Sequence, residues 1–278
     1  MSRDGLTADP SSLGRSEGGD GDGAWRKHPD CPPPREALWQ ALGWRPDPDA
    51  LGRLIRLQQE LRRWNERLNL TRLVEGDDFW IAQVYDSLWP IGPLLSRAAQ
   101  TRSVPLEMVD VGTGGGFPGL ALAIALPKAR LTLVDSVARK VEAVRAMAAS
   151  LDLGDRITVR CERIERMGRD GACRGCFDLA VARAVASAPV VAEYLVPLLK
   201  PTGRALLYRG RWSAQDQQEV ERAAQLLRAE LEAVQRHELP AGRGLRHAVV
   251  LRPLGPCPAA YPRPVGVPAK TPISGARG

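Results

Sequence analysis

A glycine-rich stretch from Val109 to Gly119 constrains the fold of this chain more than any other feature. It reads Val-Asp-Val-Gly-Thr-Gly-Gly-Gly-Phe-Pro-Gly, closes a short apolar run, and is followed at once by an apolar helical pattern from Leu120 to Leu126. This order predicts a strand, a tight turn and a helix start, where backbone N–H groups face a ligand. Glycine suits the turn because it adopts positive φ at no steric cost and lets the backbone approach a bound molecule closely. On its own, the turn is compatible with several nucleotide ligands.

After the turn, strand and helix patterns alternate along the chain. Helices are expected over residues 117–126, 137–150, 188–199 and 213–228. Such alternation predicts a mostly parallel α/β sheet with helices on both faces. The last two strands have no helix between them, which suggests an antiparallel pair at the sheet edge. The seven expected strands cover residues 106–111, 131–134, 157–161, 177–182, 205–208, 231–239 and 247–251.

The chain divides into further parts around this α/β domain, which is expected over residues 101–252. Residues 1–34 are rich in Gly, Ser, Asp and Pro and are expected to be a disordered tail. Residues 35–100 are expected to form a helical cap, with one helix starting at Asp47-Pro48 and another across 78–95. Residues 253–278 form a basic tail rich in Pro and Gly, either packed on the surface or mobile. An apolar stripe at helical spacing marks the first long cap helix: Leu51, Leu54, Leu57, Leu61, Trp64 and Leu68.

The charge distribution suggests a polyanionic partner. Residues 1–34 carry a net charge of −2, and residues 35–278 carry +9. A basic body fits nucleic acid, with a solubilising surface charge as the alternative. No apolar run reaches the roughly 18 residues of a membrane span, so no membrane partner is expected. Five cysteines, an odd number, do not suggest a disulfide framework, and a reducing cytoplasm is the expected compartment.

Asp135 points to an adenosine-like ligand. It ends the second expected strand, 25 residues after Asp110, which stands directly before the turn. In an open parallel sheet the ligand lies beyond the carboxyl ends of the strands, where a carboxylate such as Asp135 accepts hydrogen bonds from two ribose hydroxyls.

Two adenosine ligands compete for this site. Gly114, Gly116 and Gly119 satisfy the G-x-G-x-x-G spacing of dinucleotide-binding turns, so an NAD-dependent oxidoreductase remains an alternative. S-adenosylmethionine would instead use Asp110, with its amino-acid portion over Gly112 and the glycines that follow. Three features favour the methyl donor: the helical cap before the first strand, the antiparallel pair at the end, and Pro118, which removes an N–H donor from the turn.

Separate motifs outside the turn identify a family. They are Trp64 to Thr71, Asp86-Ser87-Leu88, Leu133 to Ser136, Phe177-Asp178 through Arg183-Ala184, Tyr208-Arg209-Gly210 and Arg246-His247. With these motifs, about residues 50–252 resemble the RsmG (GidB) family, bacterial methyltransferases that act on a guanine N7 of 16S ribosomal RNA. Tyr261-Pro262-Arg263 and Lys270 to Ile273 also resemble the C-terminal extension of some members. The resemblance implies a Rossmann-like class I fold, S-adenosyl-L-methionine as methyl donor, and 16S ribosomal RNA or the small ribosomal subunit as partner.

The resemblance also implies roles for particular residues. Arg183 matches an arginine at the donor and target pocket, and Arg139 and Arg163 match basic positions on the same face. The sequence departs from the family at Gln83, where many members have histidine, and at Arg139, which here precedes Lys140. The implied donor-binding residues are Asp110, Gly112, Gly114, Phe117, Asp135, Ile164, Glu165 and Arg183.

The residues that are missing agree with methylation of guanine N7. This nitrogen carries an in-plane lone pair, so positioning and desolvation suffice without a general base. Ala182 to Val185 contains neither the Asp/Asn-Pro-Pro-aromatic loop expected of amine methylases nor a cysteine nucleophile. Arg183 can offer two donors to guanine O6 or hold a phosphate. Cys173 and Cys176 form a lone CxxC without partners at ligand spacing, so no metal is expected.

The sequence thus predicts a cytoplasmic, monomeric methyltransferase of 16S ribosomal RNA. An RNA-binding protein with a vestigial donor pocket is the second alternative, beside the oxidoreductase.

Overall fold

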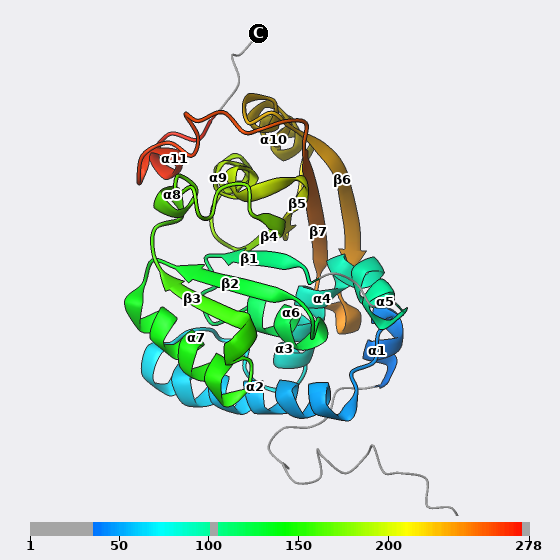
Figure 1. The fold of residues 1–278 in the computed structure, drawn as a ribbon. Helices are drawn as coiled ribbons and strands as arrows, with labels where there is room; N and C mark the ends of the chain where they lie inside the picture. The colour runs from blue at the N-terminus through cyan, green and yellow to red at the C-terminus, as the bar shows by residue number, and fades with distance from the viewer. Residues whose placement is uncertain (1–35, 101–104, 274–278) are drawn as a thin grey trace, which may run out of the picture.

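The computed structural model describes residues 36–100 and 105–273, so the tail expected at residues 1–34 lies outside the described residues (Figure 1). Seven strands form one sheet in the order β3-β2-β1-β4-β5-β7-β6. Strands β1 to β5 are parallel, and β7 runs antiparallel to both β5 and β6. The predicted mostly parallel, seven-stranded α/β fold is therefore confirmed. The strands are β1 Glu107–Val111, β2 Arg130–Asp135, β3 Ile157–Cys161, β4 Phe177–Arg183, β5 Leu199–Arg209, β6 Ala229–Glu238 and β7 Leu245–Pro253.

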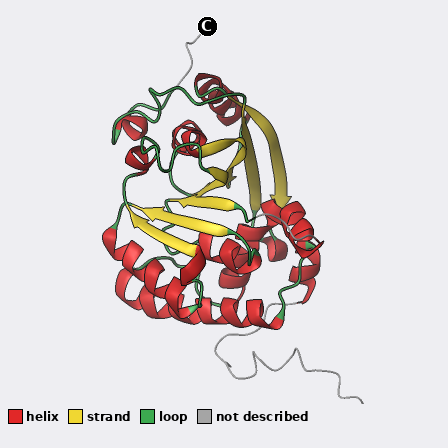
Figure 2. Cartoon of the chain, in the orientation of Figure 1, coloured by secondary structure: helices red, strands yellow, loops and turns green. Residues whose placement is uncertain are grey.

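Helices cover both faces of the sheet (Figure 2). On one face α6 (Gly119–Ala125) and α7 (Ala138–Ser150) pack with the cap, and α2 (Pro48–Leu68) runs along α7. One apolar core joins cap side chains such as Leu57 to Leu122 of α6. The cap and the sheet therefore bury apolar surface against each other. The other face carries α8 (Ile164–Met167), α9 (Ala188–Leu195), α10 (Ala214–Leu226) and α11 (Val267–Lys270).

Helix α2 begins as its sequence predicts. Asp47 is the N-cap, its carboxylate accepts a hydrogen bond from Ala50 N at 2.7 Å, and Pro48 takes the first helical position. Pro has no N–H to lose there, and the Asp side chain satisfies one of the free amides of the first turn. A shorter helix, α1 (Glu36–Leu42), precedes it.

Residues 78–95 are helical, as expected, but they do not form one continuous α-helix. This region holds a π-helical segment and then a 3-10 turn around Pro90, which lacks the N–H for an α-helical hydrogen bond. A π-helical turn is wider than an α-helical turn, so it changes the direction of the side chains that follow. Such segments are often found at functional sites. The elements are α3 Gly76–Phe79, η2 Trp80–Tyr85, α4 Asp86–Leu88, η3 Trp89–Ile91 and α5 Gly92–Gln100.

Other boundaries differ less. The strand expected at 205–208 is the longer β5, which begins at Leu199 paired with Phe177, although Pro201 and Gly203 suggest a loop. The helix before it ends at Leu195 and continues as η5 (Val196–Leu198). Two further 3-10 turns are η4 (Gly154–Arg156) and η6 (Pro240–Gly242). The short α8 and α11 have too few residues to show periodicity in the sequence.

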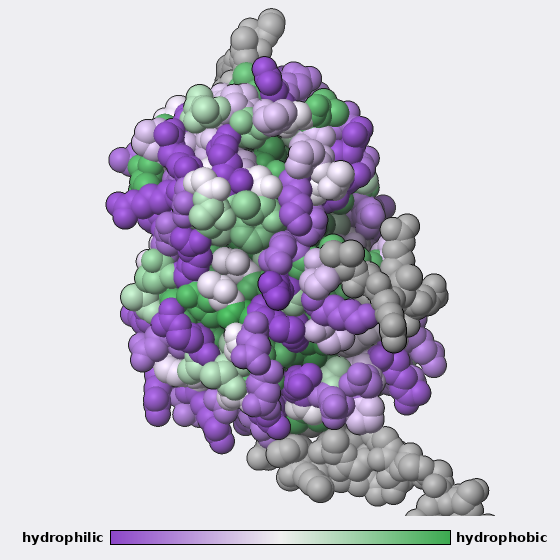
Figure 3. Space-filling view, viewed as in Figure 1, coloured by the Kyte–Doolittle hydropathy of each residue, from purple (hydrophilic) through white to green (hydrophobic). Residues whose placement is uncertain are grey.

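The described part of the C-terminal tail is packed rather than mobile. It runs from the end of β7 across the α9 and α10 face to α11 beside α8 (Figure 1), and Ile273 at its end is buried. Hydrophilic residues predominate on the face shown in Figure 3, with hydrophobic residues gathered mainly near its middle. No helix within residues 36–100 and 105–273 combines the length and apolarity needed to cross a membrane.

Candidate active site

A cavity of about 1190 Å³ opens at the carboxyl ends of the central strands. Strand β1 pairs with β2 on one side and β4 on the other, so the chain reverses its direction of progress across the sheet at this point. Ligands of open α/β sheets bind at such a point. The glycine turn, the ends of β2 and β4, the cap and the C-terminal segment all contribute to the lining, which includes Thr71, Gln83, Asp86, Gly112, Gly114, Phe117, Asp135, Lys140, Arg163, Ile164, Arg183, Tyr208, Arg246 and Ala269.

The turn requires glycine at Gly112. The N–H groups of Gly112 and Thr113 donate to the carbonyl of Val134 at 2.8 and 3.0 Å, which ties the turn to the end of β2. Gly112 has a φ of +72°, and a Cβ there would lie 2.6 Å from Cγ2 of Val185. A larger residue would therefore meet both backbone strain and a steric clash. Gly114 has a φ of +58° and also lines the cavity.

Asp110 lies beneath the turn and is not among the residues that line the cavity. Its side chain is buried, and Oδ2 accepts hydrogen bonds from Thr113 Oγ1 at 2.7 Å and from Gly119 N at 2.9 Å. Its Oδ1 has no hydrogen-bond partner. Burial raises the pKa of Asp110 to about 6 against the lowering effect of the two hydrogen bonds. The structure thus places Asp110 where it holds the two ends of the turn together.

Asp135 ends β2 and faces the cavity. Its Oδ2 accepts a hydrogen bond from Gly114 N at 3.0 Å, and its Oδ1 accepts one from Val137 N at 2.9 Å. Each carboxylate oxygen has a further lone pair, so the group can still accept ligand hydroxyls. These two amides fix the carboxylate at the rim of the turn.

Of the two positions expected after β3, only Ile164 lines the cavity. Glu165 is buried behind it and accepts hydrogen bonds from Arg163 at 2.8 and 3.2 Å, from Gly266 N at 2.9 Å and from Tyr194 Oη at 3.4 Å. Burial acts to raise the pKa of Glu165, but the hydrogen bonds from Arg163 and Gly266 outweigh it and leave the pKa below its usual value. Glu165 therefore supports the wall of the cavity as an ionised group.

Arg183 lies at the end of β4 and points into the cavity. Its guanidinium donates to Ala82 O and Asp86 Oδ2, each at 3.2 Å, and to Gln83 Oε1. It also lies 5.9 Å from the centre of the Phe117 ring. Cap and sheet thus hold one arginine together, and the orientation of Arg183 depends on both.

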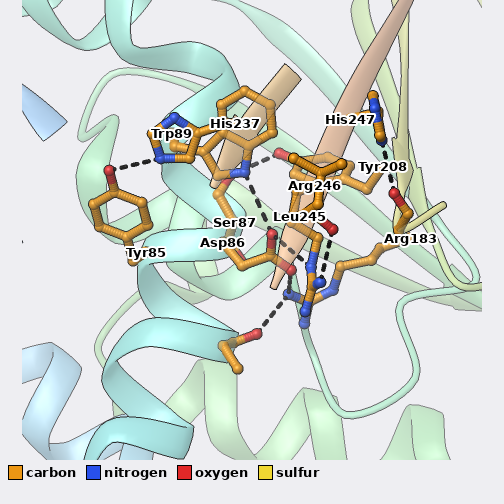
Figure 4. A network of polar contacts seen from close by, with 12 residues as sticks. Tyr85, Asp86, Ser87, Trp89, Arg183, Tyr208, His237, Leu245, Arg246 and His247 are labelled. Carbon is orange, nitrogen blue, oxygen red and sulfur yellow. Dashed lines mark hydrogen bonds and ion pairs between the residues drawn. The ribbon is translucent and has the colours of Figure 1, made fainter. Parts of the chain in front are cut away.

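Asp86 links two arginines at this end of the cavity (Figure 4). It is buried, pairs with Arg183 through Oδ2 at 3.2 Å and with Arg246 Nε through Oδ1 at 3.5 Å, and accepts from Trp89 Nε1 at 3.3 Å. Tyr208 closes the network by donating to the carbonyl of Ser87 at 2.7 Å, and burial raises its pKa well above the usual value.

Several of these contributors were not predicted from the sequence. Gln83, Asp86 and Arg246 line the cavity, although the sequence suggested no role for them beyond their motifs. Gln83 bridges Arg183 and Thr71, since its Nε2 donates to Thr71 Oγ1 at 3.1 Å. The signal was present in the Asp86-Ser87 and Arg246-His247 motifs and in the departure at Gln83.

Of the three basic residues predicted at the site, two line the cavity and one does not. Arg163 and Arg183 line the cavity, whereas Arg139 is exposed on α7 outside the lining and the neighbouring Lys140 takes its place. The described part of the chain contains no group of three or more His, Cys, Asp or Glu side chains placed to hold a metal. In the CxxC segment, Cys173 Sγ is engaged by Arg160 Nη1 at 2.8 Å.

Comparisons with known proteins agree on one family. Residues 51–244 match the GidB family model, described as rRNA small subunit methyltransferase G. A relative named Ribosomal RNA small subunit methyltransferase G, from Synechococcus sp. (strain RCC307), is 61% identical over 238 residues, which cover 86% of this chain and 98% of the relative. A relative of the same name from Prochlorococcus marinus (strain MIT 9313) is 59% identical over 240 residues, 86% of this chain and 96% of that protein.

A solved structure supports the fold alone. A candidate O-methyltransferase from Klebsiella pneumoniae superposes with a TM-score of 0.52 at 15% identity, covering 79% of this chain and 95% of that one.

Proposed function

The chain belongs to the family described as rRNA small subunit methyltransferase G, and on that premise we propose that it transfers the methyl group of S-adenosyl-L-methionine to N7 of a guanine in 16S ribosomal RNA. The observation that carries the proposal is one cavity with a glycine turn and Asp135 on one side and Arg183 and Arg246 on the other. The first pair suits an adenosine donor, and the second suits a nucleotide acceptor.

The residues present fit the donor. The backbone of Gly112 and Gly114 leaves room that any Cβ would reduce, and Asp135 offers carboxylate oxygens to ribose hydroxyls. Ile164 gives an apolar surface for the adenine. When bound, S-adenosyl-L-methionine supplies an electrophilic methyl group on a sulfonium. Asp110 contributes by holding the turn in shape.

The acidic residues around the cavity are engaged elsewhere, which suits an acceptor that needs no general base. Asp86 pairs with two arginines, Asp135 accepts two backbone amides, and Glu162 pairs with Arg160 at 2.9 Å. Asp216 caps α10. Guanine N7 attacks with its own lone pair, so orientation of the base supplies the catalysis. In this proposal Arg183 donates to guanine O6 or to a phosphate, held in place by Gln83 and Asp86.

The electrostatics of the cavity suit RNA. Basic side chains outnumber acidic ones in the lining and supply contacts for phosphates; they are Lys140, Arg163, Arg183, Arg209, Arg211 and Arg246. We propose 16S ribosomal RNA, free or within the small ribosomal subunit, as the partner, and a monomer in the cytoplasm as the working form. Arg139 is a more distant phosphate contact in this account because it lies outside the cavity.

Binding measurements test the donor. Calorimetric titration with S-adenosylhomocysteine should give micromolar affinity, and titration with NAD should give none. The opposite result would favour an oxidoreductase and overturn the proposal. An Arg183→Lys protein should keep its affinity for S-adenosylhomocysteine and lose most methyl transfer, because lysine cannot offer two parallel donors; undiminished turnover would remove Arg183 from the proposed role. Binding of RNA with no turnover in the unmodified protein would indicate a vestigial pocket.

A further inference from the structure

We propose that the C-terminal segment, residues 257–273, is a working part of the donor site, and that its short helix α11 forms the outer wall of the cavity at the adenine end. The proposal rests on the function proposed above. It assigns a binding role to residues that lie beyond the region matched by the family model, residues 51–244.

The segment reaches the cavity at two points. Ala269 of α11 lines it directly, and α11 lies beside α8, the helix that begins at Ile164 (Figure 1). Just before α11, Gly266 N donates to Glu165 Oε1 at 2.9 Å, and Glu165 also holds Arg163 and Tyr194. Because both Arg163 and Tyr194 line the cavity, the tail amide belongs to the set of contacts that fixes this wall.

A buried ion pair holds the segment in place. Glu193 of α9 is fully buried, and the Arg263 guanidinium donates to both of its oxygens at 2.7 and 2.9 Å. The backbone N–H of Arg263 donates to the same carboxylate at 2.7 Å. Loss of the Arg263 guanidinium alone would leave this carboxylate buried without its charged partner, which is strongly unfavourable. The tail and α9 therefore form one unit.

Two further arginines bind the backbone of the tail. Arg174 donates to the carbonyls of Cys257, Pro258 and Tyr261 at 2.7, 3.0 and 2.6 Å. Arg169 donates to the carbonyl of Pro262 at 2.7 Å. These contacts satisfy the carbonyls of a segment whose prolines cannot join a sheet. The long tail therefore follows one defined path to α11 rather than covering the surface at random.

The position of α11 allows the segment to cover the adenine end of the cavity. In the proposed donor pose, with the ribose at Asp135, the adenine would lie against Ile164, next to which α11 and Gly266 are placed. A wall at this point removes the base from water and limits how far it can move. The donor affinity of this chain should therefore depend on residues 257–273, whereas the contacts of Arg183 and Arg246 with Asp86 should not.

Calorimetry with S-adenosylhomocysteine on a matched set of proteins tests this inference. The set is the full chain, a chain that ends at Pro253, Gly266→Val, Ala269→Trp and the control Gly255→Val. Gly266 has a φ of +83°, in the left-handed region that favours glycine, whereas the φ of Gly255 lies outside this region. A Cβ added at either position meets nothing within 4 Å. The two valine variants thus differ in backbone strain at the wall and not in steric contact.

The full chain and Gly255→Val should bind equally, the shortened chain at least tenfold more weakly, and Gly266→Val and Ala269→Trp at least fivefold more weakly. Equal affinity in the full and shortened chains would overturn the inference. If the shortened chain no longer unfolds cooperatively, the test rests on Gly266→Val and Ala269→Trp. Unchanged affinity for S-adenosylhomocysteine in both variants would then overturn the inference. Failure of the full chain itself to bind the probe would instead overturn the proposed function, so the two failures are distinguishable.

Discussion

Asp110→Asn should change how the stability of the protein depends on pH. The carboxyl of Asp110 is buried, one of its oxygens has no partner, and burial raises its pKa from an ordinary 3.8 to about 6. The difference corresponds to ~3 kcal/mol of interaction free energy between the two protonation states. Between these two pH values the folded protein binds this proton and the unfolded chain has released it. The contribution of Asp110 to stability is therefore greatest near pH 4 and falls as pH rises through 6.

Urea denaturation at intervals from pH 4 to pH 7.5 measures the effect. The difference in unfolding free energy between Asp110→Asn and the unmodified protein should shift in favour of the variant by up to ~3 kcal/mol across this range. The other titrating groups are present in both proteins, so most of their contributions cancel. Asp155→Asn is the control, because its side chain is exposed, and its profile should stay parallel to that of the unmodified protein. A parallel profile for Asp110→Asn as well would refute the reasoning about burial.

Three further predictions concern the cavity. Gly112→Ala should lower the unfolding free energy and weaken S-adenosylhomocysteine binding at least tenfold in calorimetry, because its Cβ would lie 2.6 Å from Val185 Cγ2; unchanged binding would contradict the packing of the turn. Asp135→Ala should lower the affinity for the same ligand by roughly 10- to 100-fold, since hydrogen bonds to a charged group contribute ~1.5–3 kcal/mol. A smaller loss of affinity would argue against a ribose contact. Gln83→Leu removes an acceptor from Arg183; methyl transfer should fall by about tenfold in a filter assay with little change in donor affinity, and equal losses of both would place Gln83 in donor binding.

The sequence predicted those parts of the molecule that depend on local pattern. The alternation after Val109 gave the parallel strands, and Asp47-Pro48 gave the start of α2. Local pattern predicted that residues 78–95 are helical but not the changes of helix type, the π segment Trp80–Tyr85 and the 3-10 turn around Pro90. It failed at β5, because Pro201 and Gly203 suggest a loop while the pairing with β4 extends the strand.

Some site residues could likewise be predicted from local pattern, and others could not. Asp135 and Arg183 stand directly at strand ends, so topology alone brings them to one edge of the sheet. Asp110 and Glu165 are sequence neighbours of the cavity, but their side chains turn away from it to satisfy buried amides. That choice depends on the three-dimensional burial of each carboxylate, which no spacing rule contains.

Contacts between distant segments were the least accessible to prediction. The contact of Gln83 with Arg183 joins residues 100 positions apart, and that of Gly266 with Glu165 joins residues 101 apart. The sequence described the C-terminal segment only as basic, rich in proline and similar to the C-terminal extension of some family members. Its packing requires the complementary positions Arg174 and Glu193, which were not identified as partners from the sequence.

The most direct test of the central claim is to map the product of methyl transfer. The purified protein, S-adenosyl-L-methionine labelled in the methyl group, and either deproteinised 16S ribosomal RNA or small subunits lacking the modification should yield labelled RNA. Digestion to nucleosides followed by mass spectrometry should then find the label in 7-methylguanosine at a single position. Label in another nucleoside, or none with either substrate from a protein that binds S-adenosylhomocysteine, would contradict the account.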